Sequence, residues 1–385
     1  MTRKRILTGD RPTGKLHLGH YVGSLKNRVK LQDEYECFFI IADLHTLTTQ
    51  PEKTGELKEN VKQLVLDYLS VGIDPAKATI YLQSQIPEVA ELAIIFSNLI
   101  SVPRLERIPT LKDVMADAHI TIPSLGLLGY PVLQAADILM VKANLVPVGK
   151  DQASHIEVTR EIAREFNRLY PIARGPVSSS PPASARSGGQ SGGDQRDQVE
   201  LRVVGNPSRT ATPRLVYPER SRRVFPIPEA LIPADIGTLP GTDGKTKMSK
   251  STGNVINLSD DSATVRKKVM GMYTDPKRIH GDEPGDVANN PVFVYLEVFA
   301  SDSHKSQVIS YKEKYKKGAV KDVEVKEFLT EVLEKFLAPI RKKRAEFEKQ
   351  PELVGKILKE GTEKARLEAQ KTLSEVKRVM KLDVF

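Results

Sequence analysis

The chain has 385 residues, of which 39% are hydrophobic and 28% are charged, and it contains a single cysteine, Cys37. This length predicts a large core that divides into two domains, and one cysteine excludes a disulfide framework, a zinc ribbon and a cysteine-ligated iron–sulfur cluster. The chain has no long uncharged apolar run and no signal-peptide core, so we expect no membrane span and a location in the reducing cytoplasm.

The formal net charge of +9 is unevenly distributed. Residues 171–224 contain nine arginines, no lysine and four acidic residues, so they carry +5 and the rest of the chain carries +4. The basic balance therefore argues only weakly for nucleic-acid binding.

Strands and helices alternate through the first 170 residues. Apolar strands are predicted to end at Leu7 and to cover 37–42, 79–82 and 145–148. Helical periodicity predicts helices from Gly19 onward and over 56–71, 88–100, 104–118 and 151–169. This alternation predicts an α/β fold, a Rossmann-like parallel sheet flanked by helices. Ligands of such sheets bind beyond the carboxyl ends of the strands, where the loop after Leu7, His45 and Gly149-Lys150-Asp151 fall.

Two histidines mark the turn between the first strand and the helix that follows. His17 and His20 flank Gly19 in a glycine-containing loop that leads into a helix N-terminus. Free backbone N–H groups, the helix dipole and the space left by glycine favour a phosphate group there. The histidines can donate hydrogen bonds to phosphate oxygens as charge builds up on a leaving pyrophosphate. A metal pair or a helix cap is the alternative, but no nearby set of Asp, Glu and His completes a metal site.

A second segment, about 230 residues later, supplies cations. Lys247-Met248-Ser249-Lys250-Ser251 lies in a stretch rich in glycine and small polar residues (241–254), which predicts a mobile loop. Lys247 and Lys250 can clamp triphosphate oxygens, and mobility lets the clamp tighten as the reaction proceeds. Alone, a Lys-x-x-Lys pair is more simply a solvated basic loop. Together with the histidine segment, it predicts a device that holds a nucleoside triphosphate and expels its pyrophosphate.

These two segments resemble the HIGH and KMSKS signatures of class I aminoacyl-tRNA synthetases. His17-Leu18-Gly19-His20 is similar to the first signature and Lys247-Met248-Ser249-Lys250-Ser251 to the second. Three further stretches, 9–14, 129–139 and 146–157, resemble the bacterial, tryptophan-specific branch of that family. The resemblance covers residues 1–170 and 225–385.

The resemblance implies an activity and its partners. The expected reaction is ATP-dependent activation of L-tryptophan to tryptophanyl-adenylate, followed by transfer to the 3′ end of tRNA(Trp). Mg²⁺ would accompany ATP, bound mainly by phosphates and water, and no side chain is assigned as a metal ligand. A homodimer is also implied. Three alternatives stay open: a tyrosyl-tRNA synthetase of the same fold, a catalytically inactive RNA-binding paralogue, and an adenylyltransferase, which usually lacks the lysine loop and the helical C-terminal domain.

The resemblance also implies roles for individual residues. The expected catalytic residues are His17, His20, Lys247 and Lys250. The expected ATP-binding residues are Arg11, Thr13, Gly19, Lys112, Gly149, Asp151, Met248 and Ser249, of which Arg11 and Lys112 could instead be surface charges. The expected tryptophan-binding residues are Leu7, His45, Tyr130, Gln134, Asp137 and Gln152.

The amino-acid pocket is predicted around Asp137. If a helix starts near Pro131, then Tyr130, Gln134 and Asp137 lie near one face of it. Apolar residues surround Asp137 in the sequence, and a carboxylate there is costly without a partner, which an indole N–H would provide. The alternative is an Asp that caps a neighbouring turn. Tyrosyl enzymes usually carry a tyrosine on the first strand, where this chain has apolar residues that suit a flat indole.

The helical pattern after Ser259, with a kink at Pro339 and a last helix over 363–380, completes a division into four parts. They are a Rossmann-like catalytic region (1–170), a low-complexity block (171–224), the completion of the catalytic region (225–258) and a helical domain (259–385). The helical domain would help to bind the tRNA anticodon region; the alternative is a purely structural bundle. The block is rich in serine, glycine and proline and interrupts the resemblance, so we expect a largely disordered surface insertion. Its alternative role is an arginine-rich contact to tRNA or another polyanion.

Overall fold

The computed structural model describes residues 3–117, 120–149, 153–172, 223–232, 239–250, 252–275, 278, 280 and 282–384. Two of the predicted binding residues, Asp151 and Gln152, lie outside the described residues. Residues 173–222 also lie outside them, so the disordered insertion stays a prediction.

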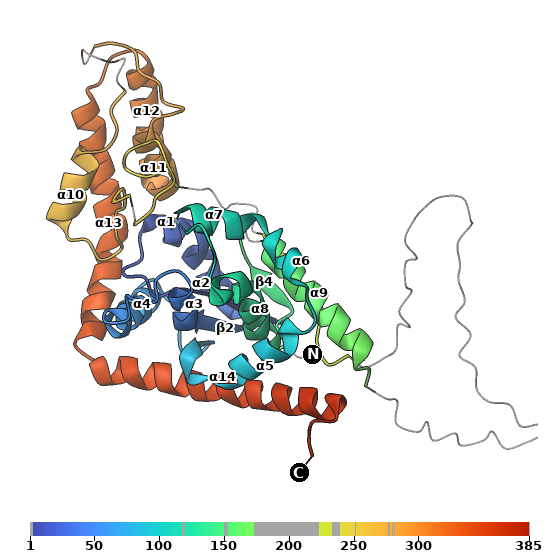
Figure 1. The fold of residues 1–385 in the computed structure, drawn as a ribbon. Helices are drawn as coiled ribbons and strands as arrows, with labels where there is room; N and C mark the ends of the chain where they lie inside the picture. The colour runs from blue at the N-terminus through green and yellow to red at the C-terminus, as the bar shows by residue number, and fades with distance from the viewer. Residues whose placement is uncertain are drawn as a thin grey trace, which may run out of the picture.

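Within the described residues, five strands form one parallel sheet in the order β3-β2-β1-β4-β5 (Figure 1). The strands are β1 (Arg5–Asp10), β2 (Glu36–Ile41), β3 (Ala78–Leu82), β4 (Leu145–Pro147) and β5 (Glu229–Leu231). Parallel strands need crossover connections, and helices supply them here. The predicted Rossmann-like α/β class is confirmed.

Helices account for most of the remaining described residues. Around the sheet they are α1 (Leu18–His20), the π-helix η1 (Tyr21–Leu25), α2 (Lys26–Glu34), α3 (Asp43–Leu47), α4 (Leu57–Ser70), the 3₁₀ helix η2 (Gln83–Gln85), α5 (Glu88–Ser97), α6 (Val102–Glu106), α7 (Pro109–Asp117), α8 (Leu125–Met140) and α9 (Ala153–Leu169). The later helices are α10 (Ser262–Met270), α11 (Pro291–Phe299), the 3₁₀ helix η4 (Asp302–His304), α12 (Lys305–Lys316), α13 (Asp322–Glu348) and α14 (Pro351–Met380). None of the helices in the described part of the chain has the length and apolar character needed to span a membrane.

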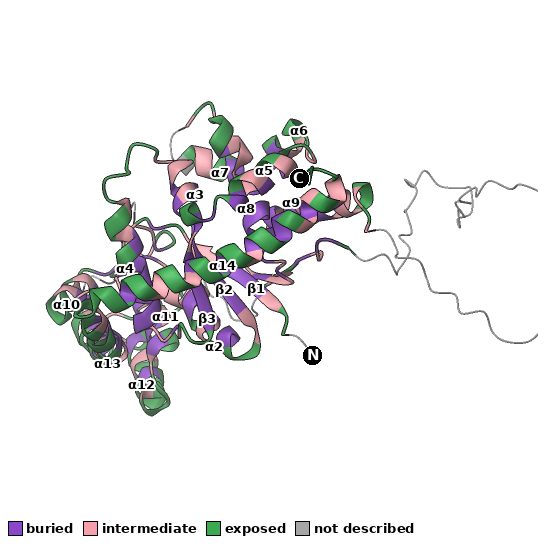
Figure 2. Ribbon diagram, turned by 90° about the horizontal axis from the view of Figure 1, so that it is seen from below, coloured by how far each residue is buried: buried purple, intermediate pink, exposed green. Residues whose placement is uncertain are grey.

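Alternate residues of the strands enter two hydrophobic cores. Ile6 and Phe39 belong to the core shared with α4 and the later helices. Leu7 and Phe38 belong to the core shared with α5, α8 and α9. A sheet covered on both faces requires apolar residues at successive positions, and Figure 2 shows the strands largely buried.

The single helix predicted over 104–118 is wrong. The structure has two helices there, α6 and α7, and α7 begins at Pro109. Proline lacks a backbone N–H and disfavours the helical conformation of the residue before it, so the first helix ends and a second begins. Apolar periodicity alone continues across such a break.

The predicted start of a helix near Pro131 is also wrong. Helix α8 begins at Leu125, and Ser124 caps it by accepting a hydrogen bond from Leu127 N at 3.1 Å. Pro131 lies inside this helix. Because the helix runs on to Met140, the residues predicted to share a face still lie on one element.

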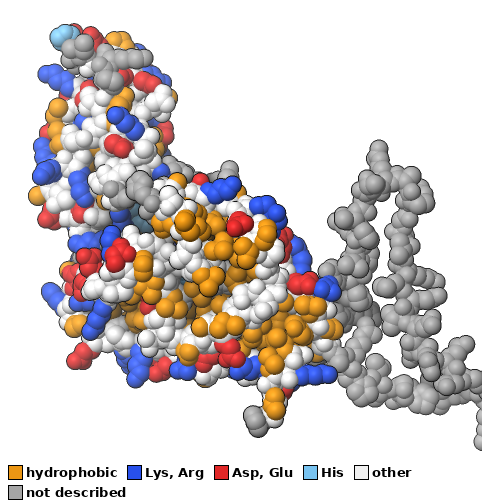
Figure 3. Space-filling view, in the orientation of Figure 1, with side chains coloured by type: hydrophobic (Ala, Val, Ile, Leu, Met, Phe, Trp, Pro, Cys, Tyr) orange, Lys and Arg blue, Asp and Glu red, His pale blue; other side chains and the backbone are white. Residues whose placement is uncertain are grey.

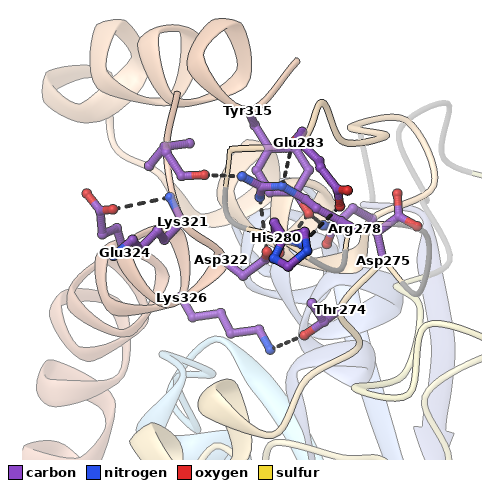
Figure 4. A network of polar contacts seen from close by, with 12 residues as sticks. Thr274, Asp275, Arg278, His280, Glu283, Tyr315, Lys321, Asp322, Glu324 and Lys326 are labelled. Carbon is purple, nitrogen blue, oxygen red and sulfur yellow. Dashed lines mark hydrogen bonds and ion pairs between the residues drawn. The ribbon is translucent and has the colours of Figure 1, made fainter. Parts of the chain in front are cut away.

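The later helices have a polar framework of their own (Figure 4). Arg278 is buried, donates to Glu283 O at 2.7 Å and forms an ion pair with Asp322 at 3.0 Å. Lys326, also buried, donates to Thr274 Oγ1 at 2.8 Å. Buried cations need such partners. These contacts fasten the segment between α10 and α11 to α13, and no strand occurs in the described residues after 259.

Helix α14 packs mainly on the edge of the sheet. It begins at Pro351, earlier than the predicted 363, and lies along the sheet in Figures 1 and 2. Leu82 N, on the edge strand β3, donates to Thr362 Oγ1 at 3.1 Å. A Cβ at Gly361 would lie 1.9 Å from Ile80 O, so glycine permits this close approach. The four-part division stays a prediction, and α14 departs from the idea of one separate helical domain.

Candidate active site

The predicted nucleotide site lies where the strand order reverses. β1 pairs with β2 from Arg5 to Asp10 but pairs with β4 only through Ile6 and Leu145. The strands on either side of this point belong to different halves of the sheet. Such a topological switch point is the usual ligand position in α/β sheets.

The two signature segments lie side by side although about 230 residues separate them. Leu18 N donates to Ile256 O, and Leu258 N donates to Leu16 O, each at 2.9 Å. The residues between them form an antiparallel bridge. The backbone that carries His17 is therefore fixed to the segment that follows the lysine loop.

The histidines are in contact and are neutral near pH 7. Their ring centroids are 3.8 Å apart, and His17 N donates to His20 Nδ1 at 3.3 Å. Burial, together with the nearby positive charges of Lys247 and Lys250, lowers the pKa of His17 to about 3 and that of His20 to about 4. The Nδ1 atom of His17 is buried without a hydrogen-bond partner in the described residues. Each ring can therefore act as a neutral hydrogen-bond donor.

The lysine loop contacts the first segment through Met248 and Lys250. Gly19 N donates to Met248 Sδ at 3.3 Å, and a Cβ at position 19 would come within 3.3 Å of Met248 Cβ. Lys250 Nζ donates to Gly14 O at 2.9 Å, and burial lowers the pKa of this ammonium group. Lys247 is exposed. The loop thus places Lys250 against the histidine segment and leaves Lys247 exposed to solvent, where a ligand can bind it.

Asn254 organises the lysine loop and was not predicted. It is 4% exposed, and its Oδ1 accepts from Ser249 N at 2.8 Å. Its Nδ2 donates to Thr246 Oγ1, Asp243 Oδ1 and Lys247 O at 3.0 to 3.3 Å. The side-chain amide of Asn254 therefore holds the loop residues between Asp243 and Ser249 together. Its place just after the lysine motif was a signal that sequence reasoning did not use.

The predicted amino-acid pocket contains a carboxylate that is already paired. Asp137 is 2% exposed; its Oδ2 lies 3.0 Å from His45 Nε2, and both of its oxygens lie within 3.0 Å of Gln83 Nε2. Burial raises the pKa of Asp137, while His45 and Gln83 act in the opposite direction. Gln83 was missed; its position at the carboxyl end of β3 was the available signal.

A second polar cluster lies beside this pair. Tyr130 Oη is 2.6 Å from His155 Nε2, which is 2.5 Å from Thr110 Oγ1. The rings of Tyr130 and His45 are 6.4 Å apart, centroid to centroid. These contacts join α7, α8 and α9 around the predicted pocket. Thr110 and His155 were not assigned roles from the sequence, because nothing local links them.

The other predicted residues are placed less specifically. Thr13 Oγ1 lies 3.4 Å from Lys250 Nζ, and Arg11 donates to Thr49 Oγ1 at 3.3 Å. Leu7 is buried in the sheet, and Gln134 and Gly149 are half-buried. Lys112 is exposed on α7, and no hydrogen bond or ion pair among the described residues joins it to either signature segment.

A polar triad of two buried residues and one half-buried residue supports β1 and was also missed. Asp10 Oδ2 accepts from Arg28 Nη1 at 2.7 Å and from Tyr68 Oη at 2.6 Å. Burial alone would raise the pKa of Asp10, but Arg28 and the two hydrogen bonds lower it to about 2. The triad ties the end of β1 to α2 and α4, next to the loop that carries the histidines.

A parallel sheet with paired histidine and lysine segments at its switch point defines an α/β enzyme that binds a nucleoside triphosphate. Residues 2–338 match the family described as tRNA synthetases class I (W and Y), and the chain belongs to this family.

Relatives with high coverage carry one name. A protein of Treponema pallidum named tryptophan–tRNA ligase is 49% identical over 380 residues, which cover 98% of this chain and 97% of the relative. A protein of Chlamydia caviae with the same name is 46% identical and covers 99% of this chain and 96% of its own length. The structure of tryptophanyl-tRNA synthetase from Campylobacter jejuni, complexed with ADP and tryptophan, is similar with a TM-score of 0.76, 30% identity, and coverage of 98% of this chain and 99% of that chain.

Proposed function

We propose that this protein joins L-tryptophan to tRNA(Trp) in two steps that consume ATP. The proposal rests on the contact between the two signature segments, which brings His17, His20 and Lys250 close together. The two relatives named tryptophan–tRNA ligase, at 49% and 46% identity over nearly the whole chain, support this choice of amino acid and tRNA.

In the first step the tryptophan carboxylate attacks the α-phosphorus of ATP in line. A bond forms between a carboxylate oxygen and the α-phosphorus, the bond to the bridging oxygen breaks, and pyrophosphate leaves with its electron pair. His17 and His20 act as neutral N–H donors to the leaving group, and Lys247 and Lys250 supply positive charge. Interactions that strengthen as charge moves onto pyrophosphate raise kcat more than they raise ground-state binding.

Mg²⁺ accompanies ATP as part of the substrate in this proposal. Among the described residues, no group of three or more His, Cys, Asp or Glu side chains could hold a metal ion. The proposed ligands are triphosphate oxygens and water, which Mg²⁺ commonly keeps. The lysines neutralise the charge that remains.

In the second step a ribose hydroxyl at the 3′ end of the tRNA attacks the carbonyl carbon of the adenylate, and AMP leaves. Neither step forms a bond to the protein, so catalysis comes from positioning and charge neutralisation. The helices α10, α11 and α12 lie away from the sheet in Figure 1, which supports a role for them in binding the anticodon region.

The pocket around Asp137 supports tryptophan as the amino acid. His45 and Gln83 hold the carboxylate in one orientation, and a carboxylate has about four lone-pair positions, so it can still accept from an indole N–H. A side chain without that donor would leave the acceptor short of a partner, which is a strong source of discrimination. Tyr130, held by His155, and Gln152 are the proposed partners of the substrate ammonium group.

A homodimer is part of the proposal. Large apolar side chains are exposed from α5 to the start of α8: Ile94 (68%), Val102 (54%), Ile122 (84%) and Leu125 (85%). Figure 3 shows hydrophobic side chains spread over the face of the sheet region that it displays. Exposed apolar side chains that gather on one face can mark an interface between subunits. The mass in solution, measured by light scattering, tests this part, and the cytoplasm is the proposed location because ATP and tRNA are present there.

The test of the function is amino-acid-dependent ATP–pyrophosphate exchange on the purified chain, with all twenty amino acids in parallel. Exchange with tryptophan alone is expected. Exchange with tyrosine would contradict the reading of the pocket, and a folded protein without any exchange would contradict the enzymatic proposal itself.

A further inference from the structure

A buried carboxylate holds the backbone immediately before His17. Asp67, on α4, is fully buried, and its Oδ2 accepts a hydrogen bond from Leu16 N at 2.8 Å. The carbonyl of Leu16 accepts from Leu258 N at 2.9 Å. Both backbone polar groups of Leu16 are therefore fixed, one by α4 and one by the segment after the lysine loop.

The other oxygen of Asp67 meets Arg344, on α13. Arg344 is 5% exposed, and its Nη1 forms the ion pair with Asp67 Oδ1. The same guanidinium donates to the main-chain and side-chain oxygens of Gln63, also on α4. Its Nε donates to Glu348 Oε1 at 3.0 Å, and the Glu348 side chain is 47% exposed. The arginine thus links α13 to α4 from inside the structure and makes one exposed contact.

Packing alone does not account for this pair. Two apolar side chains of similar volume would fill the same space, and a buried ion pair usually stabilises a fold no more than they would. A carboxylate that faces a backbone N–H on one side and a guanidinium on the other does something that apolar groups cannot do. It fixes the direction of a backbone N–H that would otherwise be buried without a partner.

We propose that Asp67 is a positioning residue for His17 and that Arg344 holds its carboxylate in the orientation that Leu16 N requires. This inference rests on the proposed function, because it assigns His17 to the leaving pyrophosphate. Helix α13 packs on α10 and α11 and also on α4, next to this pair. The pair therefore also ties the position of α13 to the histidine segment.

The variant Asp67→Asn tests the inference. An amide has one acceptor oxygen, so the new side chain serves either Leu16 N or Arg344 and turns its NH₂ group toward the other donor. The kcat of tryptophan-dependent ATP–pyrophosphate exchange is expected to fall about 10- to 100-fold while the KM for tryptophan stays within about twofold, because misplacement affects the transition state. Exchange of the Leu16 amide hydrogen, followed by NMR or mass spectrometry, is expected to become faster.

Two further variants separate positioning from folding. Glu348→Gln removes only the negative charge of the exposed partner of the same arginine and keeps an acceptor oxygen, so its kcat is expected to equal that of the wild type. The double variant Asp67→Asn/Arg344→Gln is expected to recover most of the lost kcat, because the new amide can accept from Leu16 N and donate to the new glutamine oxygen.

The inference is overturned if folded Asp67→Asn keeps the wild-type kcat, or if Glu348→Gln loses as much activity as Asp67→Asn. It is also overturned if the Leu16 amide exchanges equally fast in the wild type and in Asp67→Asn. This last measurement needs no activity, so it stays decisive even if the wild type activates no amino acid, a result that would contradict the proposed function separately.

Discussion

The two ends of the candidate site are built in different ways. The phosphate end, defined by His17, His20, Lys247 and Lys250, is made by two short segments that join through backbone hydrogen bonds. The amino-acid end, defined by His45, Gln83, Tyr130, Asp137 and His155, is made by single side chains from separate elements, each fixed by another side chain.

This difference fits what each end is proposed to recognise. A triphosphate is highly charged and moves charge during the reaction, so backbone N–H groups, neutral histidines and lysines on a loop are suitable partners. An indole offers one polar atom on a large apolar ring, so one oriented acceptor in a buried setting is enough. Changes at the phosphate end should therefore affect the rate of reaction and the use of ATP, and changes at the amino-acid end should affect affinity for the amino acid and the choice of amino acid.

The largest effect is expected from Lys250→Ala at the phosphate end. Loss of a cation that acts on the transition state should lower the kcat of tryptophan-dependent ATP–pyrophosphate exchange by about 100- to 1,000-fold. Lys245→Ala, an exposed lysine of the same loop, is the matched control and should have little effect. Equal losses in both variants would show that the loop contributes only its overall charge.

Asp137→Asn should break the amino-acid end with the next largest effect. The new amide would turn its NH₂ group toward Gln83 or His45, so the KM for tryptophan should rise about 10- to 100-fold. Steady-state exchange kinetics measure this, with Asp302→Asn, an exposed carboxylate among the later helices, as the control. An unchanged KM would remove Asp137 from the pocket.

Asn254→Ala should loosen the phosphate end without removing a charge. The KM for ATP should rise about tenfold, since the loop that carries Lys247 and Lys250 loses the amide that closes it. Thr252→Ala removes one exposed hydrogen bond to Ser249 O, at 3.0 Å, and should leave the KM for ATP nearly unchanged. A similar rise in both would mean that general loop disorder, and not Asn254, is responsible.

The last prediction concerns the pH dependence of stability, not catalysis. The pKa values of His17 and His20 are about 3 and 4 in the folded chain, below the ordinary value for histidine of about 6.5. Above pH 6.5 both histidines are therefore neutral in the folded and in the unfolded chain, and their contribution to stability is fully present. As the pH falls from about 6.5 to 4, the unfolded chain gains protons on these histidines that the folded chain does not gain. The free energy of unfolding should therefore fall by up to about 1.4 kcal/mol per pH unit for each histidine.

Urea unfolding at several pH values measures this slope. The difference between the wild type and His17→Asn/His20→Asn should shrink over that range. An unchanged difference would mean that the histidines are not buried as neutral groups.

The residues of the proposed phosphate end could be named from the sequence because their pattern is local. His17 and His20 are three residues apart, and Lys247 and Lys250 likewise, so turn and charge patterns reveal them. The parallel sheet was predicted for a similar reason, since buried strands and amphipathic helices each have a local period. What the sequence could not supply was the contact between the segments, such as Gly19 with Met248.

The amino-acid end was only partly readable. Asp137 could be predicted because a carboxylate among apolar residues needs a partner, but its partner Gln83 lies on another element. His155 and Thr110 meet across three helices, and no local pattern records such a meeting. The misplaced helix starts have a related cause, because Pro109 breaks a helix that periodicity continues, whereas Pro131 is tolerated inside one.

The dissociation constant of tryptophan, measured by calorimetry without ATP, tests the separation of the two ends most directly. In Lys250→Ala it should stay within about twofold of the wild-type value, whereas in Asp137→Asn it should rise about 10-fold or more. If Lys250→Ala weakens tryptophan binding as much as Asp137→Asn does, the phosphate end and the amino-acid end do not act separately, which contradicts the proposed division of the site.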